Sequence, residues 1–263
     1  EVIKAVYNGY SAYFSMQETP DESIVQKYIP HPDFLFFLGN TDPKKNAART
    51  LKAYALYLKA SQTKRPLLIA DLKEEYIDQL LQQEGITGIK EHLYYPGYIG
   101  NKDLATLYNA AFAFLYPSLR ESFGIPILEA MACGTPVVTG NVSAMPEVAG
   151  KGAILVDPQE PQKIADALLR LENDATLYQQ QVNYSLERVK LFSWKHTAEE
   201  YVVSDLFLPV LSSNVLPEVQ VLPAYDLLSQ ISSDDQTNTF WNPLHSAQKI
   251  FLPPQKVTQV CFP

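Results

Sequence analysis

Two glutamates that lie eight residues apart are the residues of this 263-residue chain best suited to chemistry. Glu121 and Glu129 flank Gly124 and Pro126 in the segment PSLRESFGIPILE (117–129). Glycine lets a backbone approach a ligand closely, and proline favours the first turn of a helix, whose free amides can face an anion. Glu129 would lie one turn into that helix and accept hydrogen bonds from the vicinal hydroxyls of a ribose. The same residues also fit an exposed loop acid and an ordinary acid near a helix N-terminus.

A second candidate is the segment GNTDPKKN (39–46), which is expected to join a buried strand to a helix. Amides at a helix N-terminus carry a partial positive charge, and a lysine beside them adds a full one. Lys44 and Lys45 are both available to bind a phosphate there. The alternative is a proline-containing turn with two solvated lysines.

The segment YYPGYIGNKD (94–103) is a third candidate. Glycines flank Tyr98 and Ile99, so this loop can present main-chain groups to the edge of a nucleobase, although a simple turn with exposed tyrosines fits as well. No histidine has an acidic residue at a spacing that would indicate a catalytic pair. The sequence contains no cluster with metal-ligand spacing and no Gly-x-Ser-x-Gly motif.

The elements that would position these loops alternate between strand and helix. Leu51, Tyr54, Ala55 and Leu58 form one apolar stripe of a helix, and Asp103 and Ser193 are placed to cap two others. Uninterrupted apolar runs predict strands that are buried on both faces. The predicted strands are 33–39, 66–70, 92–99, 113–118, 136–140 and 152–158, and the predicted helices are 47–61, 73–85, 103–111, 125–134, 161–173, 176–192 and 193–211.

This alternation predicts an α/β fold, a Rossmann-like parallel sheet flanked by helices. Ligands bind such sheets at the carboxyl ends of the strands, where all three candidate loops lie. We expect a linker segment with a short strand at 1–30, the ligand-binding domain at 31–192, and a C-terminal helix with an irregular tail at 193–263.

Composition argues against several classes of protein. The formal net charge is −8 and the chain has no basic run, which argues against binding nucleic acid or anionic lipid. Two cysteines, Cys133 and Cys261, are too few for a disulfide framework or a cysteine metal site, so a cytoplasmic location is expected. There is no signal-peptide pattern and no apolar stretch of membrane-spanning length. The first residue is not methionine, which suggests a fragment.

Taken together, the motifs resemble the C-terminal domain of retaining glycosyltransferases with the GT-B fold, the group 1 or family 4 type. The specific match is ESFGIPILE (121–129), followed directly by AMACGTPVV (130–138). Supporting matches are VYNG (6–9), FLGNTDPKKN (37–46), AMPEVAG (144–150), LVDP (155–158) and FSW (192–194). The resemblance covers roughly residues 1–205. It is specific for the family and weakly specific for the substrate.

The resemblance implies a role for each matching residue. Glu129 would hold the ribose of a nucleotide-diphosphate sugar, Glu121 would lie by the donor sugar, and Lys45 would bind phosphate. Tyr98 and Ile99 would contact the base, chiefly through their backbone. The implied catalytic residues are Glu121 and Lys45, and the implied substrate-binding set is Asn40, Lys44, Lys45, Tyr98, Ile99, Ser118, Glu121, Ser122, Phe123, Gly124, Ile125 and Glu129.

The implied reaction is retaining transfer of a hexose, with no cofactor and no metal. The base, the sugar and the acceptor stay open. The acceptor would be bound by an N-terminal domain that this chain lacks, so the chain alone is expected to bind a donor without transferring it. Any membrane contact would come from that missing domain.

One departure from the family pattern concerns Asn40, which stands where the family usually has an arginine. Loss of one charge-assisted phosphate contact costs about 1.5–3 kcal/mol. Either Lys44 compensates or the leaving diphosphate is held less strongly. A catalytically degenerate nucleotide-sugar-binding or scaffolding module is therefore the alternative function.

Overall fold

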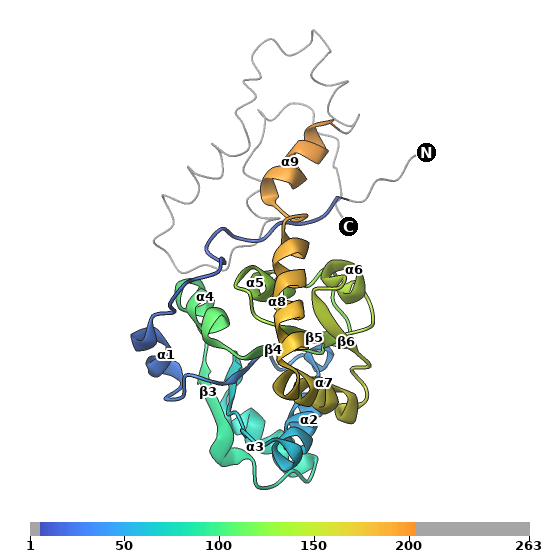
Figure 1. Cartoon of the computed structure of the whole chain (residues 1–263). Coiled ribbons are helices and arrows are strands. Elements are labelled where there is room, and N and C mark those ends of the chain that lie inside the picture. Colours follow the sequence, from blue (N-terminus) through green and yellow to red (C-terminus); the bar gives the residue numbers. More distant parts are fainter. Residues whose placement is uncertain (1–5, 204–263) are drawn as a thin grey trace, which may run out of the picture. The chain divides into compact units, whose positions relative to one another are not determined.

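The structure is a computed structural model that describes residues 6–203. The strand expected at 2–6 and the tail beyond residue 203 lie outside the described residues, apart from Val6. Within the described range, the chain forms one sheet with helices on both faces (Figure 1). The predicted α/β Rossmann-like class is confirmed.

Six parallel strands make up the sheet, in the order β3-β2-β1-β4-β5-β6. All of them fall inside the apolar runs that predicted them. The strands are β1 (Leu35–Leu38), β2 (Leu67–Ala70), β3 (Leu93–Gly97), β4 (Ala113–Tyr116), β5 (Val137–Gly140) and β6 (Ala153–Val156).

The helices follow the strands with short connections. They are α1 (Glu22–Tyr28), α2 (Ala47–Ala60), α3 (Glu74–Gln83), α4 (Asn101–Ala110), α5 (Ile125–Ala132), α6 (Met145–Ala149), α7 (Pro161–Asn173), α8 (Ala175–Val189) and α9 (Trp194–Val203). Two single 3-10 turns, η1 (Pro43–Lys45) and η2 (Lys90–His92), complete the described elements. No helix within residues 6–203 combines the length and the apolar character that crossing a membrane requires.

Alternation along the strands divides the core into two layers. Phe34 and Phe36 face one side of the sheet, together with apolar residues of α1, α4, α5 and α6. Leu35 and Phe37 face the other side, together with residues of α2, α3 and α7. Because both faces are covered, these strands read as continuous apolar runs and not as alternating ones.

The strand order reverses between β1 and β4. From β1 the chain builds outward through β2 to β3, and from β4 it builds in the opposite direction through β5 to β6. The loops that follow β1 and β4 therefore diverge at the carboxyl edge of the sheet, which is where sheets of this kind generally have their ligand-binding crevice. The first two candidate loops lie at this edge.

Three local features differ from the sequence expectation. The short helix α6 forms where no helix was predicted. The segment 1–30 contains α1, which Asp21 caps by accepting a hydrogen bond from the Ser23 amide. Asp103 does not cap α4, because that helix begins two residues earlier, at Asn101. Asp103 instead accepts from Lys27 Nζ at 2.8 Å and from Tyr28 Oη at 2.6 Å, so it joins α4 to α1.

The N-terminal segment packs on the start of α9. Ser193 caps this helix as predicted, since its Oγ accepts from the His196 amide at 3.0 Å. A Cβ atom on Gly9 would lie 2.1 Å from the Trp194 nitrogen, so only glycine allows this approach. Thr197 Oγ1 also donates to the Tyr7 carbonyl at 2.6 Å. The VYNG and FSW motifs, far apart in sequence, therefore meet in space.

Candidate functional site

An ion pair joins the loops after β1 and β4. Lys45 Nζ is 2.7 Å from Glu121 Oε1 and 2.6 Å from the hydroxyl of Tyr116, the last residue of β4. It also lies 4.7 Å from the centre of the Tyr116 ring. The side chains of Lys45 and Glu121 are only 16% and 12% exposed. The structure thus brings together the two predicted catalytic residues, and it adds Tyr116, which the sequence analysis did not select.

Side chains within the loop after β1 fix its conformation. Asn40 Oδ1 accepts from the Asp42 amide at 2.9 Å, and Asp42 Oδ1 accepts from the Lys44 amide at 3.0 Å. Lys44 Nζ pairs with the Asp42 carboxylate at 3.0 Å, in a position open to solvent. Of the two candidate lysines, therefore, Lys45 reaches Glu121 and Lys44 pairs within its own loop.

Asn46, which the sequence analysis also did not select, ties three loops together. It is buried, adopts a left-handed backbone conformation with φ 61° and precedes the first residue of α2. Its side-chain amide donates to the carbonyl of Pro117 at 2.9 Å and to that of Pro158 at 2.7 Å. These prolines follow β4 and β6, so one side chain holds the loops after β1, β4 and β6 together.

The loop after β4 leads into α5 through Gly124, whose φ is 100°. Side chains with a Cβ rarely adopt this conformation, which explains the glycine. Ser143 Oγ donates to the Glu121 carbonyl at 2.7 Å and accepts from the Glu121 amide at 3.3 Å. Ser118 is buried and Ser122 is exposed. The backbone around Glu121 is thus held in place while its side chain pairs with Lys45.

Aromatic packing holds the adjacent Phe123. Its ring centre lies 6.2 Å from that of Tyr7 and 5.9 Å from that of Phe192. Tyr7 also donates to Glu147 Oε1 of α6 at 2.7 Å. The Phe123 side chain, which lies just before the start of α5, therefore packs against Tyr7 of the N-terminal segment and against Phe192.

Glu129 lies one turn into α5, as expected. Burial raises the pKa of its carboxyl to about 7. The hydroxyl of Tyr108 lies near enough to oppose that rise, yet it makes no hydrogen bond of ordinary geometry to any described residue. The carboxyl of Glu129 therefore binds a proton more readily near neutral pH than an ordinary glutamate does.

The loop after β3 exposes one predicted residue and buries the other. The Tyr98 side chain is 68% exposed, whereas that of Ile99 packs into the core at 4%. Asp71, which follows β2, lies directly beside this loop, because its amide donates to the Gly97 carbonyl at 2.9 Å. The sequence analysis did not select Asp71, since the segment ADLKEE reads as an ordinary polar turn.

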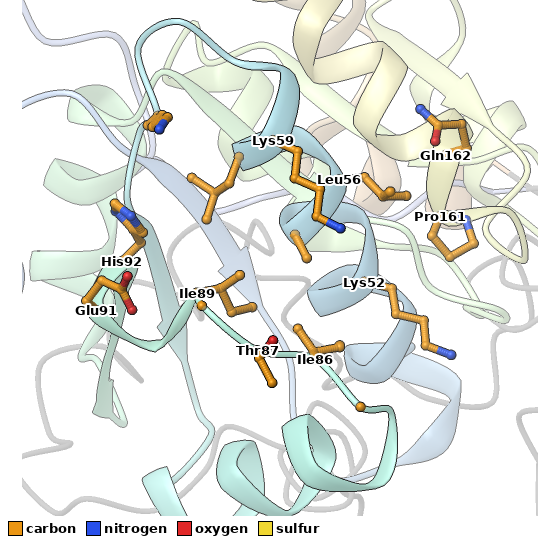
Figure 2. A pocket seen from close by; sticks show the side chains of 15 residues that line it. Lys52, Leu56, Lys59, Ile86, Thr87, Ile89, Glu91, His92, Pro161 and Gln162 are labelled. Atoms are coloured by element: carbon orange, nitrogen blue, oxygen red, sulfur yellow. The ribbon is translucent and has the colours of Figure 1, made fainter.

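Two hollows in the surface lie away from these loops. One of about 790 Å³ is bordered by α2, by the segment that precedes β3 and by the first residues of α7 (Figure 2). Lys52, Lys59, Ile86 and Thr87 line it. Another of about 410 Å³ is formed by residues that precede β1, β2 and β3 and by Tyr94 of β3, so it lies at the amino ends of the strands. Tyr94 is the one residue of the three candidate segments that lines either hollow, and we place the candidate site at the Lys45–Glu121 pair.

No group of three or more His, Cys, Asp or Glu side chains is arranged to hold a metal ion in the part of the chain that the structure describes. The predicted metal-free and cofactor-free reaction stays a prediction. Lys45 supplies a positive charge at the site, and the start of α5 supplies partial positive charges.

Comparison with known proteins identifies the family. A profile of the family "Glycosyl transferases group 1" matches residues 21–188. The chain is 34% identical over 181 residues to O-antigen chain mannosyltransferase B of Escherichia coli. That match covers 68% of this chain and 47% of the relative, so the chain spans less than half the length of this protein.

Solved structures show the same fold. The Anabaena protein HepE, in complex with UDP and glucose, superposes with a TM-score of 0.66 at 20% identity, over 80% of this chain and 56% of that one. The C-terminal domain of the group 1 glycosyl transferase LpcC from Francisella tularensis has a TM-score of 0.57 at 22% identity, over 68% of this chain and 95% of that domain. In the chain described here, the fold, the glutamate motif and the matched family profile agree with one another. The chain belongs to the group 1 glycosyl transferases.

Proposed function

We propose that the chain is the donor-binding domain of a retaining glycosyltransferase, which transfers a hexose from a nucleotide-diphosphate sugar to an acceptor held by another domain. The observation that carries this proposal is the Lys45–Glu121 pair at the point where the strand order reverses. Nucleotides bind Rossmann-like sheets at this point, and a lysine and a helix N-terminus are suited to hold a diphosphate.

The paired groups have separable tasks in this proposal. Lys45 Nζ and the amides at the start of α5 bind the diphosphate. As the bond between the anomeric carbon and the diphosphate oxygen breaks, its electrons pass to that oxygen, and the same groups stabilise the growing charge. Glu121, freed from Lys45 by the diphosphate, accepts hydrogen bonds from the hydroxyls of the sugar.

Glu129 is assigned to the ribose. Its carboxyl lies on α5, beyond the amides that face the diphosphate. In its charged form it accepts hydrogen bonds from both ribose hydroxyls, and bonds of this kind are roughly twice as strong as neutral ones. The nucleotide would thus extend from Lys45 past Glu129 toward the loop that carries Tyr98.

The comparisons support this proposal for the substrate class. HepE was solved with UDP and glucose, and the E. coli relative is named a mannosyltransferase. Both names describe proteins that handle hexoses, and the first shows a nucleotide on the same fold.

A second candidate function is a degenerate module that binds a nucleotide sugar or a protein partner without catalysis. It is favoured by the loop after β1, where Asn40 bonds to the Asp42 amide and Lys44 pairs with Asp42. In this arrangement neither side chain replaces the arginine that the family usually has after the glycine.

Titration calorimetry with nucleoside diphosphates and their hexose conjugates tests the proposed function. We expect one nucleotide to bind, and we expect Lys45→Met to weaken it by roughly tenfold to a hundredfold, the equivalent of one lost charge-assisted contact. Lys44→Met removes the same charge from the adjacent position and serves as the control, with a smaller expected loss. If no nucleotide binds at millimolar concentration, the donor-binding proposal is wrong.

A further inference from the structure

We propose that Asp71 reads the nucleobase of the donor and selects guanine. The inference rests on the proposed function and deepens it, because it names the donor class. It starts from the position of Asp71 between the loops that would hold the phosphate and the base.

Asp71 stands at the carboxyl edge of the sheet, one residue beyond β2. The preceding residue, Ala70, accepts from the Gly39 amide at 3.4 Å, and Asp71 itself donates to Gly97. Gly39 opens the loop that carries Lys45, and Gly97 opens the loop that carries Tyr98. A nucleotide that runs outward from Lys45, across β2 toward β3, therefore passes Asp71.

The negative charges of Asp71 and Glu129 both act on the buried hydroxyl of Tyr108. Burial raises the pKa of that hydroxyl first, and the two charges raise it further, Glu129 more than Asp71. If Glu129 holds the ribose, the base attached to that ribose is within reach of Asp71.

Asp71 has an uncommon backbone conformation. Its φ is 62°, in the left-handed region that costs most L-residues about 1–2 kcal/mol and that aspartate and asparagine adopt more readily. Such outliers gather at ligand sites, where the geometry serves binding. The residue is exposed to solvent, and surrounding protein still raises the pKa of its carboxyl by partial burial.

The carboxylate of Asp71 has no hydrogen-bond or ion-pair partner among residues 6–203. Other aspartates near chain turns are engaged: Asp21 and Asp42 cap helical turns, and Asp103 binds Lys27 and Tyr28. Asp71 alone of these four has both oxygens free to accept hydrogen bonds from a ligand.

Guanine is the base whose hydrogen-bonding edge matches a free carboxylate. Its N1–H and N2–H₂ groups are adjacent donors, and the two oxygens of a carboxylate accept such a pair side by side. Uracil offers a single N–H between two carbonyl oxygens, which a carboxylate repels. Adenine offers one amino group beside ring nitrogens that only accept.

Calorimetry with GDP, IDP, UDP and ADP tests this inference. IDP carries hypoxanthine, which keeps the N1–H of guanine and lacks the N2 amino group. We expect GDP to bind roughly tenfold to a hundredfold more tightly than UDP or ADP, with IDP between them, because a good bidentate pair discriminates by that amount.

The variant Asp71→Asn is the critical one. Asparagine tolerates the left-handed conformation, so the fold is expected to survive. Removing a negative charge would by itself strengthen binding of the anionic nucleotides, so a weaker affinity for GDP can only come from a lost contact. We expect the Asp71→Asn chain to lose its preference for GDP. We expect it to bind UDP as tightly as the wild-type chain does, or more tightly. Glu75→Gln, which removes an exposed charge from the first turn of α3, is the matched control and should leave the selectivity unchanged.

The outcomes separate this inference from the proposed function. If another nucleotide binds more tightly than GDP, or if Asp71→Asn weakens all four equally, Asp71 does not select guanine and the donor-binding function stands. If none of the four binds to the wild-type chain, the proposed function fails and this inference fails with it.

Discussion

At the scale of single residues, the Lys45–Glu121 pair has the clearest consequence for binding. Lys45 pairs with Glu121 and donates to the hydroxyl of Tyr116, and both side chains of the ion pair are largely buried. An incoming diphosphate must compete with Glu121 for Lys45. The pair therefore holds the lysine in place while weakening the first contact with an anion.

We expect Glu121→Gln to bind a nucleoside diphosphate more tightly than the wild-type chain does, by about threefold to tenfold, since the competing charge is removed. A nucleotide sugar should gain less, because in our proposal it loses the carboxylate contact to the sugar. Calorimetry with both ligands on the same preparation gives the two affinities. Equal gains for both ligands would contradict the assignment of Glu121 to the sugar.

Glu129 makes nucleotide binding depend on pH. Its pKa is raised to about 7 by burial, and the charged form accepts hydrogen bonds from the ribose hydroxyls more strongly than the protonated form does. We expect the affinity for a nucleotide sugar to fall about tenfold between pH 8 and pH 6. A nucleotide sugar is the right probe, since its diphosphate does not titrate in this range. In Glu129→Gln the binding should be weaker and the pH dependence flat.

The same group makes stability depend on pH in the opposite direction. The folded-state pKa lies above the unfolded value of 4.5, so the folded chain binds more protons between these two values and becomes less stable as the pH rises through them. The penalty is complete above pH 7 and amounts to about 3 kcal/mol at most. We expect Glu129→Gln to melt higher relative to the wild type at pH 8 than at pH 5. A melting difference that does not change with pH would contradict the raised pKa.

At the scale of elements, Glu172 joins α7 to the turn between α2 and β2. Its carboxylate is 5% exposed and pairs with Arg65 Nη1 at 2.9 Å. Tyr57, Ser61 and Thr63 also donate to it through their hydroxyls. Burial alone would raise its pKa, but these donors together hold the pKa below the ordinary value for a glutamate. One carboxylate thus accepts hydrogen bonds from most of the polar side chains of this turn, at the amino edge of the sheet.

We expect Glu172→Ala to lower the free energy of unfolding by about 3–5 kcal/mol, since it leaves Arg65 and several hydroxyls without their partner. Urea unfolding monitored by circular dichroism measures the change. Glu187→Ala is the control, because Glu187 pairs with Lys190 on the surface and its side chain is 72% exposed. Its expected effect is within about 1 kcal/mol. Equal effects of the two substitutions would show that the Glu172 cluster does not stabilise the fold.

The sheet and the longer helices were predictable because their signals are local. Each strand of the central sheet is a short apolar run, and α2 shows its apolar stripe directly in the sequence. The helix α1 was missed because it spans seven residues of which only Val25 is buried, so it has little periodicity to detect. The Asp103 cap was wrong because its partners, Lys27 and Tyr28, are more than seventy residues away.

The candidate site was likewise predictable only in part. The spacing of Glu121, Glu129 and the lysines placed them in loops that the fold brings to one edge, and the structure puts Lys45 against Glu121. Tyr116, Asn46 and Asp71 could not be selected in advance. Their contacts depend on the strand order and on backbone conformations that no short pattern records.

At the scale of the whole molecule, donor binding and transfer are expected to separate. The chain spans 47% of the length of its mannosyltransferase relative. In our proposal, Lys45 and Glu121 bind the nucleotide sugar, whereas the acceptor is assigned to another domain. We expect this chain to bind its nucleotide sugar and to release no nucleoside diphosphate above background when sugar acceptors are added.

A coupled assay for released nucleoside diphosphate measures this directly. The control is the same chain with an acceptor-binding domain from a relative supplied on one polypeptide. Turnover by the chain alone that Lys45→Met abolishes would contradict the assignment of the acceptor to another domain.

The bonds of Asn46 have a consequence for how this site can change. Its amide holds the loops after β4 and β6 through the carbonyls of Pro117 and Pro158, which are main-chain groups that every residue possesses. Side chains elsewhere in those loops can therefore be replaced without losing the anchor, so substrate preference can evolve, or be engineered, on a constant frame. Asn46 itself cannot be replaced in this way. Aspartate there would place a negative charge against two carbonyl oxygens, and the hydrogen bonds that join the three loops would be lost.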